Sequence, residues 1–404
     1  MRRIKVLTLT DQLVALGGGA ERVALEIASR LDPARFESVY CASRYSEGLE
    51  IESVQVAERR LDNAGVRYFG LGRSSRADIY RWLLLHRVLR REQVDVLHTH
   101  MFGSNAAGTV IGRLARVPVI VAHEHTWSFE GLPVRRMVDR EVIGRGSTVF
   151  VAVSRDDQRK MVEIEGVNPD KILHIPNGIA APPPPTGADV RAELGIPAEA
   201  PVIGTVSVLR PQKALDVFIR ASARLLAENP DLWVLLAGDG PLWTELTQLV
   251  ESLGVQDRLL MLGYRSDSPD VMAALDVAVS SSAYEGSPLA VMEYMESARP
   301  IVATRVGGVP DLIEDGVHGL LVEPGDESGL VDAIRRMLGD RDAAARMGEA
   351  ARERRRREFT IEVMVSRFEA LYERLVAGEG LPEDYSQLLP GASNATSPAS
   401  AGLV

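Results

Sequence analysis

Two arrays of short apolar runs of β type, each alternating with helical runs, constrain the fold of this chain most. The runs of the first half are Ile4–Leu9, Phe36–Cys41, Val66–Phe69, Val94–Leu97, Val117–Val121, Thr148–Val153 and Ile172–Ile175. Those of the second half are Pro201–Val208, Leu232–Ala237, Arg258–Leu262, Asp276–Ser280, Ile301–Thr304 and Gly319–Val322. The helical runs between them include Leu215–Glu228. Strands that alternate with helices form mostly parallel sheets covered on both faces. The sequence therefore predicts an α/β protein with two Rossmann-like, doubly wound domains.

A proline-rich segment separates the two arrays. Four consecutive prolines, Pro182–Pro185, form a stiff spacer. We assign residues 1–180 to a first domain, 181–189 to the linker, 190–358 to a second domain and 359–377 to a final helix. From about residue 378 the composition turns to Gly, Pro, Ser and Ala without apolar periodicity, which predicts a disordered tail over 378–404. Two such domains leave one cleft between them, where a ligand of two chemical parts would lie.

Charge and cysteine content narrow the partners and the compartment. The net charge of −10 argues against nucleic acid as the main partner, and the single cysteine, Cys41, fits a reducing compartment. No run approaches the ~20 apolar residues of a membrane span, so we expect a cytoplasmic protein. The basic run Arg352–Arg357 is most simply a solvated helix face. Its alternative role is peripheral contact with an anionic membrane surface.

The stretch Ser280–Glu293 carries the main candidate site, because it passes from a strand through a serine- and glycine-rich loop into a helix. Ser287 is expected as the residue that caps the helix and Pro288 as its first residue. The free amides of Ser287, Leu289 and Ala290 then favour a bound phosphate or diphosphate.

Two carboxylates bracket this phosphate seat. Glu285 and Glu293 would repel a phosphate, so we expect them to accept hydrogen bonds from hydroxyls on either side of a diphosphate. A ligand with hydroxyls on both sides of a diphosphate is a nucleotide sugar. Arg210 and Lys213 follow another strand and suit the diphosphate, whose negative charge grows as it leaves.

Histidines follow two strands of the first half. His98 and His100 lie after one apolar run, and His123 and His125 after the next. Imidazoles two residues apart on an extended chain point the same way, so a zinc site is one alternative. Contacts to ligand hydroxyls or phosphate, and simple burial at the strand ends, are the others.

The two glutamates, with seven residues between them and Gly286-Ser287-Pro288-Leu289 after the first, resemble the signature of the retaining glycosyltransferases of family 4, which have the GT-B fold. Further motifs of that family occur in order up to about Val331. The resemblance implies donor contacts by Gly18 and Gly19 (diphosphate), His100 and Glu285 (sugar), Gly263, Tyr264 and Arg265 (base), Gly286, Ser287, Pro288, Leu289 and Ala290 (helix start), and Glu293 (ribose). It also implies that the last helix crosses back onto the first domain.

The chain departs from the family pattern at three places. Ser207-Val208 stands where Gly-Arg is usual, so Arg210 is expected to take over the role of that arginine. Ala180 replaces a common aspartate, and Asp311 a more usual glutamate. The acceptor would be chosen by loops of the first domain such as Trp127–Pro133.

The function implied is metal-independent, retaining transfer of a sugar from a nucleoside diphosphate sugar to an acceptor hydroxyl on a glycan, lipid or small molecule. No cofactor is expected beyond that co-substrate. In the favoured mechanism the leaving phosphate takes the acceptor's proton, and Glu285 as a covalent nucleophile is the other version. The alternatives are a sugar-nucleotide epimerase or hydrolase on the same fold, and a non-catalytic sugar-nucleotide-binding subunit.

Overall fold

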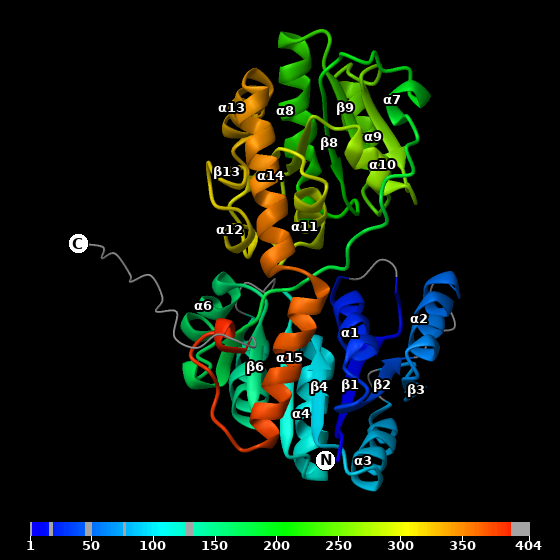
Figure 1. Ribbon diagram of the computed structural model, residues 1–404, viewed down its shortest axis with the longest axis vertical. Coiled ribbons are helices and arrows are strands. Elements are labelled where there is room, and N and C mark those ends of the chain that lie inside the picture. Colours follow the sequence, from blue (N-terminus) through cyan, green and yellow to red (C-terminus); the bar gives the residue numbers. More distant parts are fainter. Residues whose placement is uncertain (1, 16–18, 45–50, 76–77, 127–131, 389–404) are drawn as a thin grey trace, which may run out of the picture.

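The structure is a computed structural model that describes residues 2–15, 19–44, 51–75, 78–126 and 132–388 (Figure 1). The first sheet has seven parallel strands in the order β3-β2-β1-β4-β5-β6-β7. They are β1 (Ile4–Gln12), β2 (Phe36–Arg44), β3 (Arg67–Gly70), β4 (Val96–His100), β5 (Val119–Glu124), β6 (Val149–Ala152) and β7 (Ile172–His174). The connecting helices are α1 (Gly19–Arg30), α2 (Ile51–Asn63), η1 (Ile79–Arg81), α3 (Trp82–Arg91), α4 (Met101–Ala115), α5 (Pro133–Val138), η2 (Asp139–Gly144), α6 (Arg155–Glu163) and η3 (Pro169–Lys171).

The second sheet has six parallel strands in the order β10-β9-β8-β11-β12-β13. They are β8 (Val202–Val206), β9 (Trp233–Ala237), β10 (Leu259–Gly263), β11 (Val277–Ser280), β12 (Ile301–Thr304) and β13 (Leu320–Val322). The helices here are α7 (Val190–Glu193), η4 (Pro211–Lys213), α8 (Leu215–Glu228), α9 (Trp243–Ser252), α10 (Ser268–Ala273), α11 (Leu289–Glu296), α12 (Val309–Leu312), α13 (Glu327–Gly339) and α14 (Arg341–Glu358). The predicted α/β class with two doubly wound sheets is confirmed.

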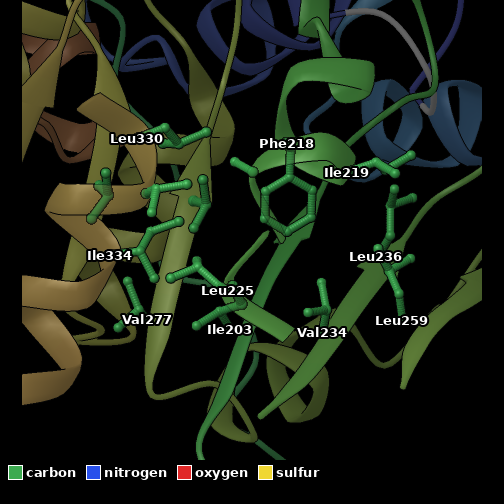
Figure 2. Close-up of a cluster of buried hydrophobic side chains, with 14 of the residues drawn as sticks. Ile203, Phe218, Ile219, Leu225, Val234, Leu236, Leu259, Val277, Leu330 and Ile334 are labelled. Carbon is green, nitrogen blue, oxygen red and sulfur yellow. The ribbon is translucent and has the colours of Figure 1, made fainter. Parts of the chain in front are cut away.

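Each sheet is buried between helices, as its unbroken apolar strands require. In the second domain α8 and α13 cover one face, where Phe218, Leu225 and Ile334 pack on Ile203 and Val277 (Figure 2). The helical runs predicted from apolar periodicity differ little from those observed. The predicted run Leu215–Glu228 coincides with α8.

The last helix, α15 (Ile361–Val376), leaves the second domain and lies along the first sheet (Figure 1). Phe368 and Tyr372 are fully buried there against Val121 and its neighbours. The crossing needs Gly178, because a Cβ at that position would lie 2.3 Å from the carbonyl oxygen of Thr360. A side chain at residue 178 would therefore push the final helix off the first domain.

Two sequence-based expectations about the chain's end are wrong. Arg355, in the supposed solvated run, is only 2% exposed, donates to Glu296 (2.9 Å) and donates to the carbonyl oxygen of Ile179 (2.6 Å). Residues 378–388 are also ordered: η5 (Tyr385–Leu388) folds back, and Leu388 is buried in the first domain's core. Local composition predicted neither result, since both depend on partners far away in the chain. Residues 389–404 lie outside the described part.

No helix in the described ranges is long and apolar enough to cross a membrane.

Candidate active site between the two domains

The start of α11 is the centre of the candidate site. The helix begins at Leu289, and the residue before it, Pro288, is extended (φ −72°, ψ 115°). The prediction of Ser287 as the cap and Pro288 as the first helical residue is therefore wrong by one position. Ser287 is instead buried, and its carbonyl oxygen accepts a hydrogen bond from Asn177 of the first domain (3.3 Å). The amides of Leu289 and Ala290 remain at the helix start.

Glu285 and Lys213 form a buried ion pair beside this helix start. Lys213 Nζ lies 2.6 Å from Glu285 Oε1, and Ser282 Oγ donates to the same oxygen at 2.7 Å. Gln212 donates to the other carboxylate oxygen at 3.1 Å. Lys213 and Ala290 also line one small cavity, so the cation and the helix start face the same space. The arrangement offers positive charge and free amides to a phosphate, with an oriented carboxylate next to it.

Glu293 meets the first domain directly. Arg22 Nη1, near the start of α1, lies 3.1 Å from Glu293 Oε1, and both side chains are partly exposed. Gly19 approaches as well, because a Cβ there would lie 3.9 Å from Leu289 Cδ1. The start of α1 therefore approaches α11, and Gly18 lies outside the described residues. The sequence patterns gave Arg22 no role.

The four histidines lie together at the ends of β4 and β5. His98, His100 and His123 are all 0% exposed. His98 is bonded to Tyr372 (2.6 Å) and His123 (3.3 Å), whereas His100 bonds to His125 (3.0 Å). His125, just beyond the end of β5, is partly exposed as a residue, but its Nε2 bonds to His100 and its Nδ1 is buried. Contact between His100 and the donor sugar stays a prediction.

His125 lies at the domain contact. A Cβ on Gly286 would come within 2.0 Å of the carbonyl oxygen of His125, so only glycine fits there. Gly307 is equally constrained: its φ is +49°, and a Cβ would lie 1.7 Å from the carbonyl oxygen of Glu285. Glycines thus allow the Glu285 loop to pack closely between the His125 strand end and the next loop.

The metal alternative has partial geometric support. One ring nitrogen from each of His98, His100 and His123 lies within 4.8 Å of the others. Zinc–nitrogen bonds of about 2.0–2.1 Å require ligand nitrogens only about 3.4 Å apart, so the rings would have to move closer. Phe368 packs against His98 and His123, which leaves this core little freedom to rearrange.

The remaining predicted residues do not join this cluster. Arg210 is exposed, and its charge acts on Glu21 of the first domain rather than forming a described pair with the diphosphate seat. Arg265 is held by Glu193 (2.6 Å) and Asp267 (2.6 Å). Tyr264 is 71% exposed, and the carbonyl oxygen of Gly263 accepts from Gly238 (2.8 Å).

A cavity of about 530 Å³ opens next to Glu285, between the two domains. Arg155, Arg159 and Lys160 of α6 line one side, and Arg305 and Asp311 line the other. Asp311 also closes the domain contact, since its carboxylate accepts from the backbone amide of Arg155 at 2.8 Å. Asp156 lines the same side and pairs with Arg159 and Lys160 (2.6 Å), so the cavity combines several cations and carboxylates with direct access to Glu285.

Two family models match the chain. Glycosyltransferase Family 4 matches residues 17–181, and Glycosyl transferases group 1 matches residues 188–354. A D-inositol 3-phosphate glycosyltransferase of Corynebacterium glutamicum (strain R) is 30% identical over 317 residues, which cover 72% of this chain and 75% of the relative. The chain belongs to the family 4, group 1 glycosyltransferases.

The glycosyltransferase has further relatives of the same kind. A UDP-Gal:alpha-D-GlcNAc-diphosphoundecaprenol alpha-1,3-galactosyltransferase of Escherichia coli is 29% identical over 276 residues, covering 65% of this chain and 71% of the relative. The Anabaena protein HepE, solved in complex with UDP, superposes with a TM-score of 0.78 at 23% identity, covering 92% of this chain and all of that one. The GT-B fold expected from the resemblance is confirmed.

The buried histidines predict acid sensitivity of this glycosyltransferase. Burial lowers the pKa of His98, His100 and His123 well below 6.5, and that of His125 to about 3. Below pH 6.5 the unfolded chain therefore binds more protons than the folded chain does. The contribution of these histidines to the free energy of unfolding is full above pH 6.5 and is lost as the pH falls below it. At pH 5 each such histidine is expected to destabilise the fold by about 2 kcal/mol.

Urea unfolding at pH 7.5, 6.5 and 5 would measure this effect. Burial also raises the pKa of Glu124 to about 8 and the pKa values of Glu21, Asp139 and Asp311 above their usual range, which acts in the opposite direction. A His125→Gln variant should show a shallower loss between pH 6.5 and 5. A free energy of unfolding that stays constant over that interval would contradict the assignment.

Proposed function

We propose that this glycosyltransferase transfers a sugar from a nucleoside diphosphate sugar to an acceptor hydroxyl with retention of configuration and without a metal. The observation that carries the proposal is the arrangement around α11. Lys213 and Ala290, at the helix start, line one small cavity. Lys213 is paired with Glu285 in the loop before α11, and Glu293 lies within α11 and is paired with Arg22 of the first domain. A diphosphate at the helix start would have one hydroxyl-bearing group on each side.

Different residues of the site would contact different parts of the donor. Glu293 is placed to accept hydrogen bonds from ribose hydroxyls, which would compete with its contact to Arg22. Glu285 would orient the transferred sugar, and His100, expected as a second contact to that sugar, bonds to His125 at the domain contact. We keep Gly263, Tyr264 and Arg265 as base contacts and Arg210 as a second cation for the diphosphate. Arg210 would have to swing toward Lys213 to act there.

Chemistry in this site would depend on charge stabilisation. Lys213 and the amides of Leu289 and Ala290 would neutralise the diphosphate as it leaves, which favours bond cleavage. The departing phosphate oxygen would then accept the proton of the acceptor hydroxyl, on the same face of the sugar. Lys213 and Glu285 are paired with each other in the structure. Donor binding would separate them, so that Lys213 contacts the phosphate and Glu285 contacts the sugar.

The relatives favour a UDP-sugar donor. The E. coli relative's name specifies UDP-Gal, and HepE has been solved with UDP-glucose as well as with UDP. Their acceptors differ, since one relative's name specifies a diphosphoundecaprenol-linked sugar and another inositol phosphate. Both acceptors carry phosphate, and we place the acceptor's charged part in the cavity next to Glu285.

The donor is tested first by measuring which ligands the parent protein binds, and then by repeating the measurement on a Glu293 variant. Ribose belongs to donor and product alike, so Glu293→Gln should weaken the binding of nucleoside diphosphate and nucleotide sugar about equally, by roughly tenfold for a lost charge-assisted contact. Calorimetry with a panel of nucleoside diphosphates would measure both affinities. Glu296→Gln is unsuitable as a control because Glu296 holds Arg355, so the exposed Glu251→Gln serves instead.

Unchanged affinity of the Glu293 variant for every nucleoside diphosphate would show that Glu293 does not contact ribose.

Incubation of the parent protein with nucleotide sugar alone distinguishes transfer from the alternative activities. Rapid, complete conversion without acceptor indicates an epimerase or hydrolase. Tight donor binding without turnover on any phosphate-bearing acceptor indicates a binding subunit.

A further inference from the structure

Three successive helical segments on the first domain share a distinctive outer surface. α3 packs on α4, and α4 packs on η2, which continues α5. These helices cover the sheet face that carries Leu7, Leu97 and Ile120, whereas α15 covers the opposite face. In Figure 1 α3 lies at the end of the first domain that is away from the second domain. We call their exposed side chains the arginine–apolar face.

The apolar part of this face is unusually large. Of the fifteen large apolar side chains that are exposed in the described residues, nine belong to these three segments. Ile79 and Val134 are each 71% exposed, and Leu114 is 64% exposed. The nine are Ile79, Tyr80, Leu83, Leu84, Val110, Leu114, Leu132, Val134 and Met137. Exposed apolar groups gathered on one surface mark an interaction site.

The charged part of the face is predominantly basic. Nine exposed arginines accompany the apolar residues: Arg81, Arg87, Arg90, Arg91, Arg113, Arg116, Arg136, Arg140 and Arg145. No described residue between 79 and 145 is both acidic and exposed. Arg140 and Arg145 share Glu141, but the other seven form no ion pair with a described residue. Residues 79–145 hold ten arginines and six acids, a net charge of +4 in a chain of −10.

The acids of these segments are turned inward. Asp139 is 1% exposed and Glu124 is 7% exposed, and both bind the buried Arg135 (3.3 and 3.2 Å). The basic character of the surface therefore results from folding, which hides the carboxylates and leaves the arginines outside.

We propose that the arginine–apolar face binds a membrane surface that contains anionic lipids. Apolar side chains with arginines around them match the two layers of such a surface, the acyl boundary and the negative headgroups. The rest of the chain is strongly acidic, so repulsion would leave this face as the favoured contact. The run Arg352–Arg357, considered from sequence for the same role, is unsuited because Arg355 is buried and Arg356 is bound to Glu296.

Binding in this orientation would have a consequence for the cleft. α4 begins at the end of β4, directly after His100, and α5 follows the end of β5 and His125. The helices that carry the face therefore start at the sheet edge that borders the candidate site. A membrane held by this face would lie next to the cleft entrance.

Vesicle cosedimentation tests the proposal without any activity measurement. The full chain should bind vesicles of phosphatidylcholine with about 30 mol% phosphatidylglycerol at least about tenfold more strongly than vesicles of phosphatidylcholine alone. Salt at about 0.5 M should remove most of that preference through screening. Equal binding to both kinds of vesicle, or to neither, would overturn the proposal.

Matched variants locate the surface. Arg87→Glu with Arg90→Glu should weaken binding to the anionic vesicles at least about tenfold, because each arginine near such a surface contributes about 1 kcal/mol. Arg346→Glu with Arg357→Glu changes charge equally on exposed positions of α14 and should have less than about a twofold effect. An equal loss in both pairs would mean that net charge, not this face, controls binding.

The apolar part is tested in the same way. Leu83→Gln with Leu114→Gln should weaken vesicle binding, whereas Leu253→Gln with Val317→Gln, at exposed positions of the second domain, should not. Thermal unfolding of each variant verifies the fold. Sedimentation without lipid tests the other possible partner, a second copy of this chain. If the protein does not bind vesicles but forms a dimer, and the Leu83 and Leu114 changes dissociate that dimer, the face is a dimer interface instead.

Discussion

Glu285→Gln is expected to lower sugar transfer by about 10²-fold or more while leaving the affinity for nucleoside diphosphate nearly unchanged. In the proposed function Glu285 contacts the transferred sugar, a group that the product lacks. The glutamine keeps the shape, and its single oxygen can still accept from Ser282, which holds the carboxylate at 2.7 Å, whereas its NH2 group replaces the oxygen that accepts from Gln212 at 3.1 Å. It loses the charge that orients Lys213 and the sugar hydroxyls.

Steady-state transfer and calorimetric affinity for the product, measured on the same preparation, test this expectation. Glu251→Gln, an exposed change on α9, is the control for general effects of a lost carboxylate. Wild-type transfer by the Glu285 variant would make the residue a structural partner of Lys213. A large loss of nucleoside diphosphate affinity would instead place Glu285 against the diphosphate through its lysine.

Gly286→Ala should abolish most transfer by acting on the domain contact. The added methyl group would lie 2.0 Å from the carbonyl oxygen of His125, a backbone atom that no rotamer change can move. The two domains would have to separate by more than 1 Å at this point. Displacements of that size cost about 10²-fold in rate, because the reacting groups lose their alignment.

The measurement is transfer rate together with the thermal unfolding of the variant. Each domain keeps its own core, so we expect the unfolding temperature to change far less than activity. Gly339→Ala is the matched control, since a Cβ there meets nothing within 4 Å. Full activity in the Gly286 variant would show that the domains do not need this approach for catalysis.

The sequence alone determined the elements and the outline of the donor site. Strand and helix positions follow from runs of neighbouring residues, which is why the predicted run Leu215–Glu228 matches α8 and the predicted run Ile301–Thr304 matches β12. The choice of Glu285, Glu293 and Lys213 as candidate site residues rested on their spacing in the sequence and on the chemistry of their side chains. The structure brings Lys213 and Glu285 together at 2.6 Å, as their common role requires.

Only the tertiary structure decided how the four histidines are buried, whether the basic run of α14 is solvated and where the chain's end packs. His98 and His123 lie on neighbouring strands, and Phe368 of α15, from far along the chain, packs against both rings. Arg355 is buried because it donates hydrogen bonds to Glu296 and to the carbonyl oxygen of Ile179, where the chain crosses between the domains. The arginine–apolar face likewise exists only after folding has turned Glu124 and Asp139 inward. Local patterns record which residues can form a helix or strand, but exposure depends on contacts between distant segments, and no single stretch of sequence contains both sides of such a contact.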